Sequence, residues 1–170
     1  MLFLAALLTS PWLLGPALAT TTTTIAITTT TTGRCPEGWV DAHWAEMGCL
    51  LFNTSRPYTW ELANNYCNQE ENASLVEILT PEQHEFVILE LEHMAESGYD
   101  SAWWTSGTDM GKEGRWYWAQ SLALVEEFVW FGNEPNLPTE NCMNLKLAFD
   151  YMAGDINCAT AYYPPICQTK

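Results

Sequence analysis

Residues 130–142 read WFGNEPNLPTENC, two aromatic residues followed by turn formers and acids that end at a cysteine. Glycine, asparagine and two prolines favour turns, so residues 132–140 are expected to form a loop. Glu134 and Glu140 offer carboxylate oxygens and Asn136 offers an amide oxygen, which are the ligand types that calcium prefers. The segment therefore predicts a cation site in a loop.

The surrounding chain is strongly acidic. Its 170 residues include 21 Asp and Glu against 6 Lys and Arg, giving a formal net charge of −15. Nucleic acids and anionic membranes are therefore not expected as partners, because phosphate contacts require lysine and arginine. The charge is compatible with a cation site, although most of the acids are expected simply to face solvent. The length suits one domain of ordinary size.

The N-terminal residues 1–19 have the features of a secretory signal peptide. They carry no charged side chain and end in Ala17-Leu18-Ala19, a small-residue cleavage pattern. The run is short for a membrane span and Pro11 and Pro16 break it, so a signal peptide is favoured over a membrane helix. No later segment is apolar enough to cross a bilayer, and the chain is expected to be secreted and extracellular.

A threonine-rich stalk is expected at residues 20–34, where residues 20–32 read TTTTTIAITTTTT. Such a tract cannot bury a core, and an O-glycosylated extended stalk and an undecorated disordered tail remain equal alternatives. Two N-glycosylation acceptors follow, at Asn53 and Asn72, and both fit a secreted glycoprotein.

From Cys35 onward the composition is that of a globular domain, with all six cysteines and every tryptophan except Trp12. Helical spacing predicts a first helix over residues 60–71. A second helix begins at Thr80-Pro81, with Gln83 completing a capping box, and ends at residues 97–98. Its core face is expected to include Phe86, either Leu89 or Glu90, and either His93 or Met94.

Short aromatic and apolar runs after this second helix predict strands. The expected strands are residues 103–106, 115–119, 128–131, 142–147 and 157–163. Helices first and strands later indicate an α+β fold rather than a parallel alternating sheet.

Together these features resemble the C-type lectin-like domain, over residues 35–168. The motifs that carry the resemblance occur in the order of that family: Cys35-Pro36-Glu37-Gly38-Trp39, Trp104-Thr105-Ser106-Gly107-Thr108-Asp109, Gly114-Arg115-Trp116-Tyr117-Trp118, Glu134-Pro135-Asn136, Glu140-Asn141-Cys142 and Pro165-Ile166-Cys167. The amino-acid sequences of these motifs are most similar to those of arthropod secreted lectins. The resemblance implies two helices, small antiparallel sheets and a long ligand-binding loop, stapled by disulfides.

Disulfide pairing is implied by the same resemblance. Six cysteines allow 15 pairings, and the family pattern selects Cys35–Cys49, Cys67–Cys167 and Cys142–Cys158.

The resemblance also implies a calcium ion bound by Glu134, Asn136, Glu140 and Asp155, with a cis bond before Pro135. Two vicinal sugar hydroxyls would complete the shell of the ion, and the same four residues would contact the sugar. The Glu-Pro-Asn order implies glycans of the mannose, N-acetylglucosamine, fucose or glucose type, and a role in innate immune recognition.

One departure from the family pattern affects this site. Gly154 stands where the family has an asparagine ligand, and Ala153 stands where it has a tryptophan. Asn157 is the nearest amide in the sequence, although it points the wrong way in a regular strand.

A second, auxiliary calcium site is suggested by Asp109, Glu113 and Asn141. Leu137 occupies a position where a further acid would be expected.

The sequence has two alternatives to calcium-dependent sugar binding. A lectin-like fold that binds a protein or another surface without calcium or sugar is favoured by Gly154 and opposed by the intact Glu-Pro-Asn motif. An enzyme is not expected: Glu134 and Glu140 lie in one loop, and a shared calcium would hold both ionised, which removes the acid that a glycosidase needs.

Other enzyme-like features are missing from the sequence. The three histidines, His43, His84 and His93, are too scattered for zinc, and His84 and His93 are expected at the surface or half buried.

Overall fold

The computed structural model describes residues 34–70 and 72–169. The expected signal peptide and all of the expected stalk except Arg34 lie outside the described residues, so both stay predictions. None of the described helices is long and apolar enough to cross a membrane.

Within the described ranges the chain forms two α-helices, three short 3-10 helices and eight strands. In chain order they are β1 (Val40–Asp41), η1 (His43–Ala45), β2 (Cys49–Phe52), α1 (Trp60–Gln69), β3 (Ala73–Leu75), α2 (Pro81–Glu96), β4 (Ala102–Thr108), β5 (Tyr117–Trp118), η2 (Glu127–Val129), β6 (Cys142–Lys146), η3 (Leu147–Phe149), β7 (Ala153–Ile156) and β8 (Ile166–Thr169).

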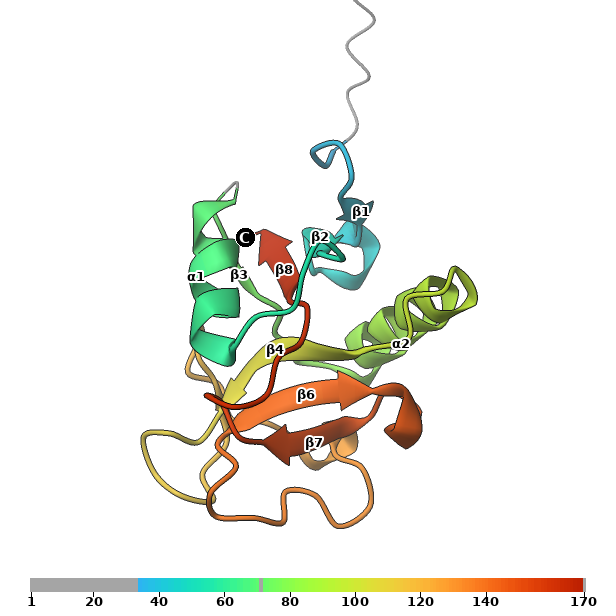
Figure 1. The fold of residues 1–170 in the computed structure, drawn as a ribbon. Helices are drawn as coiled ribbons and strands as arrows, with labels where there is room; N and C mark the ends of the chain where they lie inside the picture. Colours follow the sequence, from blue (N-terminus) through green and yellow to red (C-terminus); the bar gives the residue numbers. More distant parts are fainter. Residues whose placement is uncertain (1–33, 71, 170) are drawn as a thin grey trace, which may run out of the picture. The chain divides into compact units, whose positions relative to one another are not determined.

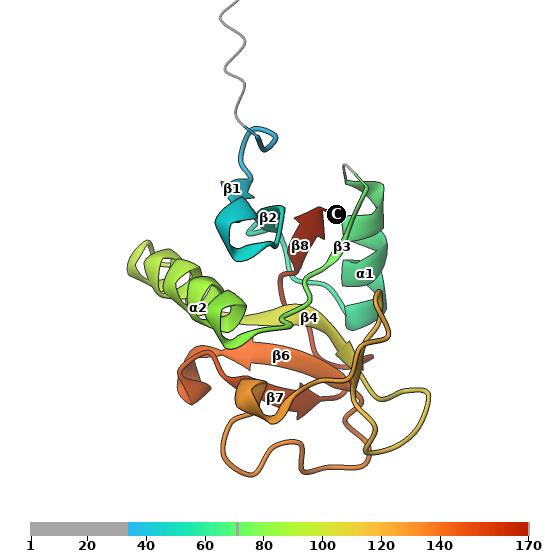
Figure 2. The same cartoon turned by 180° about the vertical axis from the view of Figure 1, so that it is seen from behind.

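The strands make two antiparallel sheets, in the orders β1-β2-β8-β3 and β5-β4-β6-β7. β8 lies between β2 and β3, so the two ends of the domain are joined in one sheet. Figures 1 and 2 show α1 and α2 on opposite sides of the molecule, with the long loop before β6, drawn in orange, beyond β6 and β7. The expected α+β architecture of two helices and two small sheets is confirmed.

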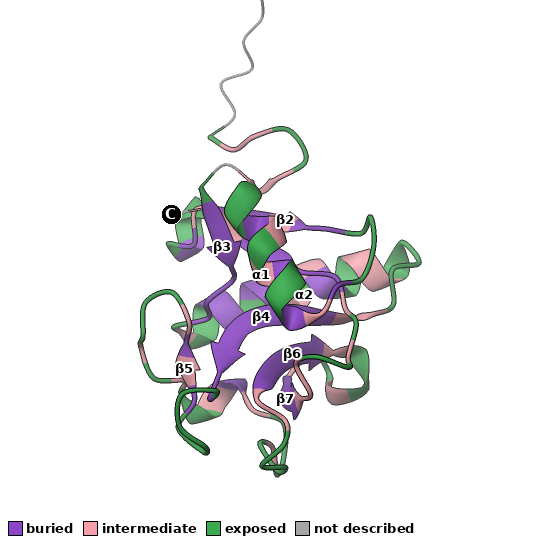
Figure 3. Ribbon diagram, turned by 60° about the vertical axis from the view of Figure 1, so that its left-hand side comes forward, coloured by how far each residue is buried: buried purple, intermediate pink, exposed green. Residues whose placement is uncertain are grey.

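The first helix forms as its spacing predicts. Trp60, Ala63 and Cys67 are buried along one face of α1, at positions one and two turns apart. Figure 3 shows the opposite face of α1 exposed and β4 almost wholly buried. Cys67 on this inner face reaches Cys167 of β8, so α1 is bonded to the first sheet.

The second helix begins as predicted. The Thr80 hydroxyl accepts a hydrogen bond from the Gln83 backbone N–H at 3.3 Å, and Pro81 follows at the first helical position. The Gln83 carboxamide oxygen accepts from Leu79 N–H at 2.7 Å, one residue before the cap.

The predicted core face of α2 is right at Phe86, and of the predicted alternatives Glu90 and Met94 are half buried while Leu89 is 56% exposed. The prediction for His84 was wrong, because this residue is only 4% exposed instead of lying at the surface or half buried. The buried face comprises Gln83, His84, Phe86, Val87 and Leu91. This face is selected by packing against η1 and η2, which come from distant parts of the chain.

Two predicted strands were also wrong. Residues 127–129 form the 3-10 helix η2, and residues 157–163 contain a turn. The Asn157 side-chain oxygen accepts hydrogen bonds from Ala159 N–H and Thr160 N–H, both at 3.0 Å, and such local bonding favours a turn over a strand. The strand that does form here is β7, whose Ala-Gly-Asp sequence gives no strand signal.

The described cysteines form three disulfides, and they are the pairs that the resemblance implies. They join Cys35 to Cys49, Cys67 to Cys167 and Cys142 to Cys158. The last bridge connects the start of β6 to the residues just after β7, beside the long loop.

Candidate calcium and carbohydrate site

The Asp155 carboxylate holds the Glu-Pro-Asn turn against β7. It accepts hydrogen bonds from Asn136 N–H, at 3.2 Å to each oxygen, and from Leu137 N–H at 3.0 Å. The Glu134–Pro135 bond is cis, and the Asn136 amide donates to Glu134 Oε2 at 2.7 Å. Glu134, Asn136 and Asp155, which are far apart in the sequence, are therefore brought together.

The acids of the loop repel one another. Burial, the contact with Asp155 and the charge of Glu140 raise the pKa of Glu134 to about 7, while Lys146 opposes the rise. Burial and the charge of Asp155 also raise the pKa of Glu140, again against Lys146. Three carboxylates thus share one small region that has Lys146 as its basic neighbour. A bound cation would relieve this repulsion.

The carboxylates are close without being fully converged. A metal site needs at least three donor atoms close to one another. Over residues 34–70 and 72–169, only Cys35, His43 and Cys49 have acid, histidine or cysteine ligand atoms that all lie within 4.8 Å of one another. That trio is no metal site, because its two cysteines are bonded to each other. Glu134, Glu140 and Asp155 would have to draw closer to surround one ion. Their donor types still fit calcium, which takes carboxylate and amide oxygens.

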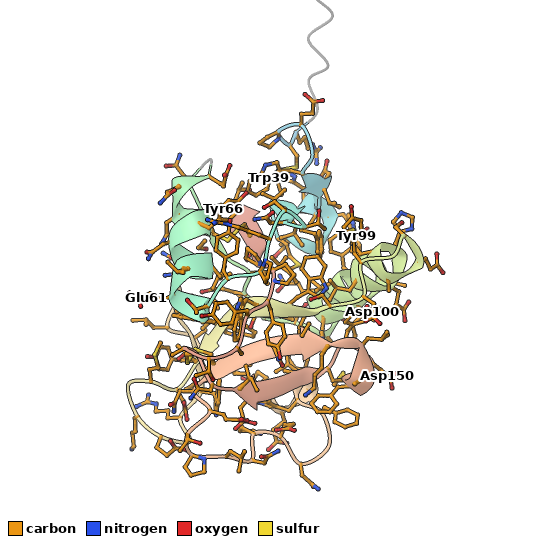
Figure 4. All side chains as sticks on the ribbon, in the orientation of Figure 1. Trp39, Glu61, Tyr66, Tyr99, Asp100 and Asp150 are labelled. Carbon is orange, nitrogen blue, oxygen red and sulfur yellow. A yellow bond between two sulfur atoms is a disulfide. The ribbon has the colours of Figure 1, made fainter. Side chains whose placement is uncertain are left out.

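The place of the missing asparagine at residue 154 is filled by an aromatic ring. A Cβ atom on Gly154 would lie 2.8 Å from Cε2 of Phe149. The Phe149 ring stacks on Phe131, with ring centroids 4.3 Å apart and planes 6° apart, and the Lys146 ammonium lies 3.7 Å from its centroid. Figure 4 shows the side chains of this region, with Asp150 labelled at the turn directly after Phe149.

Asn157 does not take over the missing role in this conformation. Its oxygen is engaged in the turn described above, and its amide nitrogen donates to Thr139 O at 3.4 Å.

The residues of the suggested auxiliary site are also brought together. The Asn141 amide donates to Asp109 Oδ1 at 2.9 Å and to Glu113 Oε2 at 3.5 Å, and Asp109 Oδ2 accepts from Gly114 N–H at 2.7 Å. Asp109 is only 1% exposed. A small cavity of about 150 Å³ lies between this cluster and the main site, with Asp155 also in its wall.

A larger groove of about 640 Å³ adjoins the main site. Its walls include Arg115, Trp116, Trp130, Glu134 and Pro135. Trp130 is only half buried and packs edge-to-face on the buried Trp116, with ring centroids 4.8 Å apart. Its partly exposed ring is a surface on which a sugar can stack.

Sequence reasoning missed Asn144 and Lys146. Asn144 is 1% exposed, and neither polar atom of its amide has a hydrogen-bond partner among the described residues. Such a buried amide costs about 1–3 kcal/mol. The available signal was a polar residue in the middle of the otherwise apolar run Cys142–Leu145.

The two N-glycosylation acceptors differ in exposure. Asn53 is 5% exposed, and its amide nitrogen, to which a glycan would be attached, is buried without a partner in the described part of the chain. Asn72 is exposed, in the turn before β3. The geometry therefore opposes glycosylation of Asn53 and leaves Asn72 accessible.

Comparison with known proteins agrees with this architecture. The family model described as the Lectin C-type domain matches residues 56–169. The chain is 32% identical to human lithostathine-1-beta over 102 residues, which is 60% of this chain and 57% of that protein. The aligned region thus spans little more than half of that relative.

Two solved structures extend the similarity. Human lithostathine has a TM-score of 0.67 and 28% identity, with 80% of this chain and 99% of that chain covered. A Ca²⁺-dependent type II antifreeze protein in its Ca²⁺-free form has a TM-score of 0.66 and 28% identity, with 80% and 100% covered. The matched family consists of binding domains without enzymatic activity, as expected from the loop chemistry. The chain belongs to the C-type lectin domain family.

Proposed function

We propose that this chain is a secreted, calcium-dependent carbohydrate-binding protein of mannose-type specificity. The observation that carries the proposal is the meeting of Glu134, Asn136 and Asp155 beside Glu140, with Lys146 as the basic neighbour. Repelling carboxylates and one amide in a single loop are a suitable donor set for calcium.

The residues have separable tasks. Oxygens of Glu134, Asn136, Glu140 and Asp155 would hold the ion. When bound, calcium would supply free coordination positions for two vicinal hydroxyls of a sugar. The carboxylates accept hydrogen bonds from those hydroxyls, and the Asn136 amide donates one. The Asp155 carboxylate additionally orients the turn by accepting hydrogen bonds from the backbone N–H groups of Asn136 and Leu137.

Several finer assignments belong to the same proposal. The signal peptide predicted at residues 1–19 supports secretion, and Asn72 is the accessible N-glycan acceptor. The proposed role in innate immune recognition and the likeness to arthropod secreted lectins rest on the amino-acid sequences of the motifs alone. A single sugar site binds weakly, so strong adhesion would require clustering of several copies.

The alternative is a lectin-like domain that binds a protein or another surface without calcium or sugar. Gly154 and the ring of Phe149 that fills its side-chain position favour this alternative. Family members differ in ligand, as the similarity to an antifreeze protein illustrates.

Elution from immobilised mannose separates the two functions. Wild-type protein is expected to be retained in millimolar calcium and released by a chelator, while Glu134→Gln passes through. Glu37→Gln removes one exposed acid near the first disulfide and is expected to behave as wild type. Retention that survives the chelator, or no retention at all, would contradict the proposal and favour the alternative.

A further inference from the structure

Asn144 is an unexplained polar residue in the middle of β6. Its neighbours Met143 and Leu145 are fully buried in the main core, and Asn144 itself is 1% exposed. Neither atom of its amide is hydrogen-bonded by any described residue. An apolar side chain of the same size would avoid the cost of burying an unpaired amide. Packing alone therefore gives no reason for an asparagine at this position.

The location of Asn144 supplies a reason. In the ladder between β6 and β7, Asn144 is paired with Gly154, and paired residues project to the same face of a sheet. The Asn144 amide oxygen lies 3.6 Å from the position that a Cβ on Gly154 would take. An amide is thus present beside residue 154, carried by the neighbouring strand.

The adjacent residues connect this amide to the calcium site. Asp155 follows Gly154 directly in β7 and binds the Glu-Pro-Asn turn. Lys146, two residues after Asn144 on the same strand, places its ammonium 3.7 Å from the centroid of the Phe149 ring beside residue 154. Asn144 is therefore flanked on both strands by residues of the site.

Phe149 covers the same place. Its ring approaches the Cβ position of residue 154 to 2.8 Å and is half buried. It is carried by the short η3 helix, outside the β-ladder, so a rotation of its side chain leaves the hydrogen bonds of β6 and β7 intact.

We propose that Asn144 supplies the amide oxygen that residue 154 lacks, and that the Phe149 ring turns aside when calcium binds. This inference rests on the proposed function, because it names a further ligand of the same site. It also explains why a buried amide without a partner among the described residues stands between the buried Met143 and Leu145.

The test combines calcium titration by calorimetry with thermal unfolding in a chelator, on the full chain. Asn144→Leu is expected to weaken calcium binding about tenfold and to unfold at a higher temperature in the chelator. Asn144→Asp keeps an oxygen at the same place and is expected to bind calcium at least threefold more tightly than wild type. Ser106→Ala is the matched control, since Ser106 is also 1% exposed with an unpaired side-chain oxygen, and calcium binding should not change.

Each result decides the matter. Wild-type calcium affinity in Asn144→Leu, with no binding in Glu134→Gln, would overturn the role of Asn144 and leave the proposed function standing. A lower unfolding temperature of Asn144→Leu with unchanged affinity would also overturn it, and would make the amide structural. If Asn144→Leu does not fold, Asn144→Asp decides, and unchanged or weaker binding there refutes the role. Absence of calcium binding by the wild type would overturn both proposals.

Discussion

Gly154 and Phe149 occupy one small volume between them. The glycine has no side chain, and the ring fills the space to within 2.8 Å of where a Cβ would be. The ring is also stacked on Phe131, so it cannot retreat without giving up that contact. Even the smallest side chain at residue 154 therefore has to displace an aromatic pair.

Gly154→Ala is expected to lower the free energy of unfolding by about 1–3 kcal/mol, the usual cost of overpacking. In a Phe149→Ala background the same substitution should cost less than about 1 kcal/mol, because the ring is gone. Urea unfolding of the four proteins in the cycle measures the coupling. Equal costs in both backgrounds would show that the ring does not constrain residue 154.

His84 gives the molecule a pH-dependent stability. Burial lowers the pKa of His84, and its hydrogen bond to the Tyr151 carbonyl partly opposes this. The unfolded chain therefore takes up a proton at about pH 6.5, where the folded protein does not. The stabilisation is complete above that pH and is lost as the pH falls from about 6.5 toward the lower folded pKa.

The stability advantage of the wild type over His84→Gln is thus expected to shrink on acidification from pH 7.5 to pH 5. The change is at most about 1.4 kcal/mol per pH unit, the limit for one proton. Taking the difference between variants cancels the titration of Glu134 and Glu140, which both proteins share. A constant difference for His84→Gln would contradict the assignment.

At the scale of elements, the Cys142–Cys158 bridge is placed to hold the site. Glu140 lies two residues before Cys142, and Asp155 lies three residues before Cys158. The Cys35–Cys49 bridge closes a loop of similar length, because its sequence separation is 14 and that of Cys142–Cys158 is 16. It lies far in the sequence from Glu134, Glu140 and Asp155. The two bridges form a natural matched pair.

Replacing either pair by alanine is expected to lower the free energy of unfolding by about 3 kcal/mol. Only the loss of Cys142–Cys158 should weaken calcium binding, by about tenfold, because β6 and β7 are then less firmly held together. Urea unfolding and calcium calorimetry on the two variants test this. Equal effects on calcium affinity would mean that the bridge contributes to stability alone.

Elements with local signals could be predicted from the sequence, and those that depend on distant partners could not. The helices were found through Thr80-Pro81 and through the spacing of Trp60 and Cys67, which act within a few residues. β7 was missed because Ala153–Ile156 becomes a strand by pairing with β6. The reversed burial of Leu89 and His84 likewise comes from packing against η1 and η2.

The same division holds for the site. The loop acids and the Glu-Pro-Asn turn were visible because they are neighbours in sequence. The filling of residue 154 by Phe149, the ammonium of Lys146 and the unpaired amide of Asn144 arise from packing across strands. The missing ligand at Gly154 could therefore be predicted from the sequence. The ring of Phe149 that fills its place, and the amide of Asn144 that is proposed to replace it, could not.

At the scale of the whole molecule, an acidic chain carries one loop whose Glu134 and Glu140 lie near Asp155 of β7. The net charge of −15 favours the approach of cations, and the β6–β7 ladder and the Cys142–Cys158 disulfide hold the loop beside β7. Linkage then requires that a sugar sharing the ion should tighten calcium binding, and that calcium should tighten sugar binding by the same factor.

Calorimetric titration of calcium, with and without mannose, tests this central claim most directly. The wild type is expected to bind calcium at about 10⁻⁴–10⁻³ M, more tightly when mannose is present, and Glu134→Gln is expected to show no binding. Absence of heat up to about ten times that range, or a calcium affinity that mannose does not alter, would contradict a calcium ion shared between the loop and a sugar.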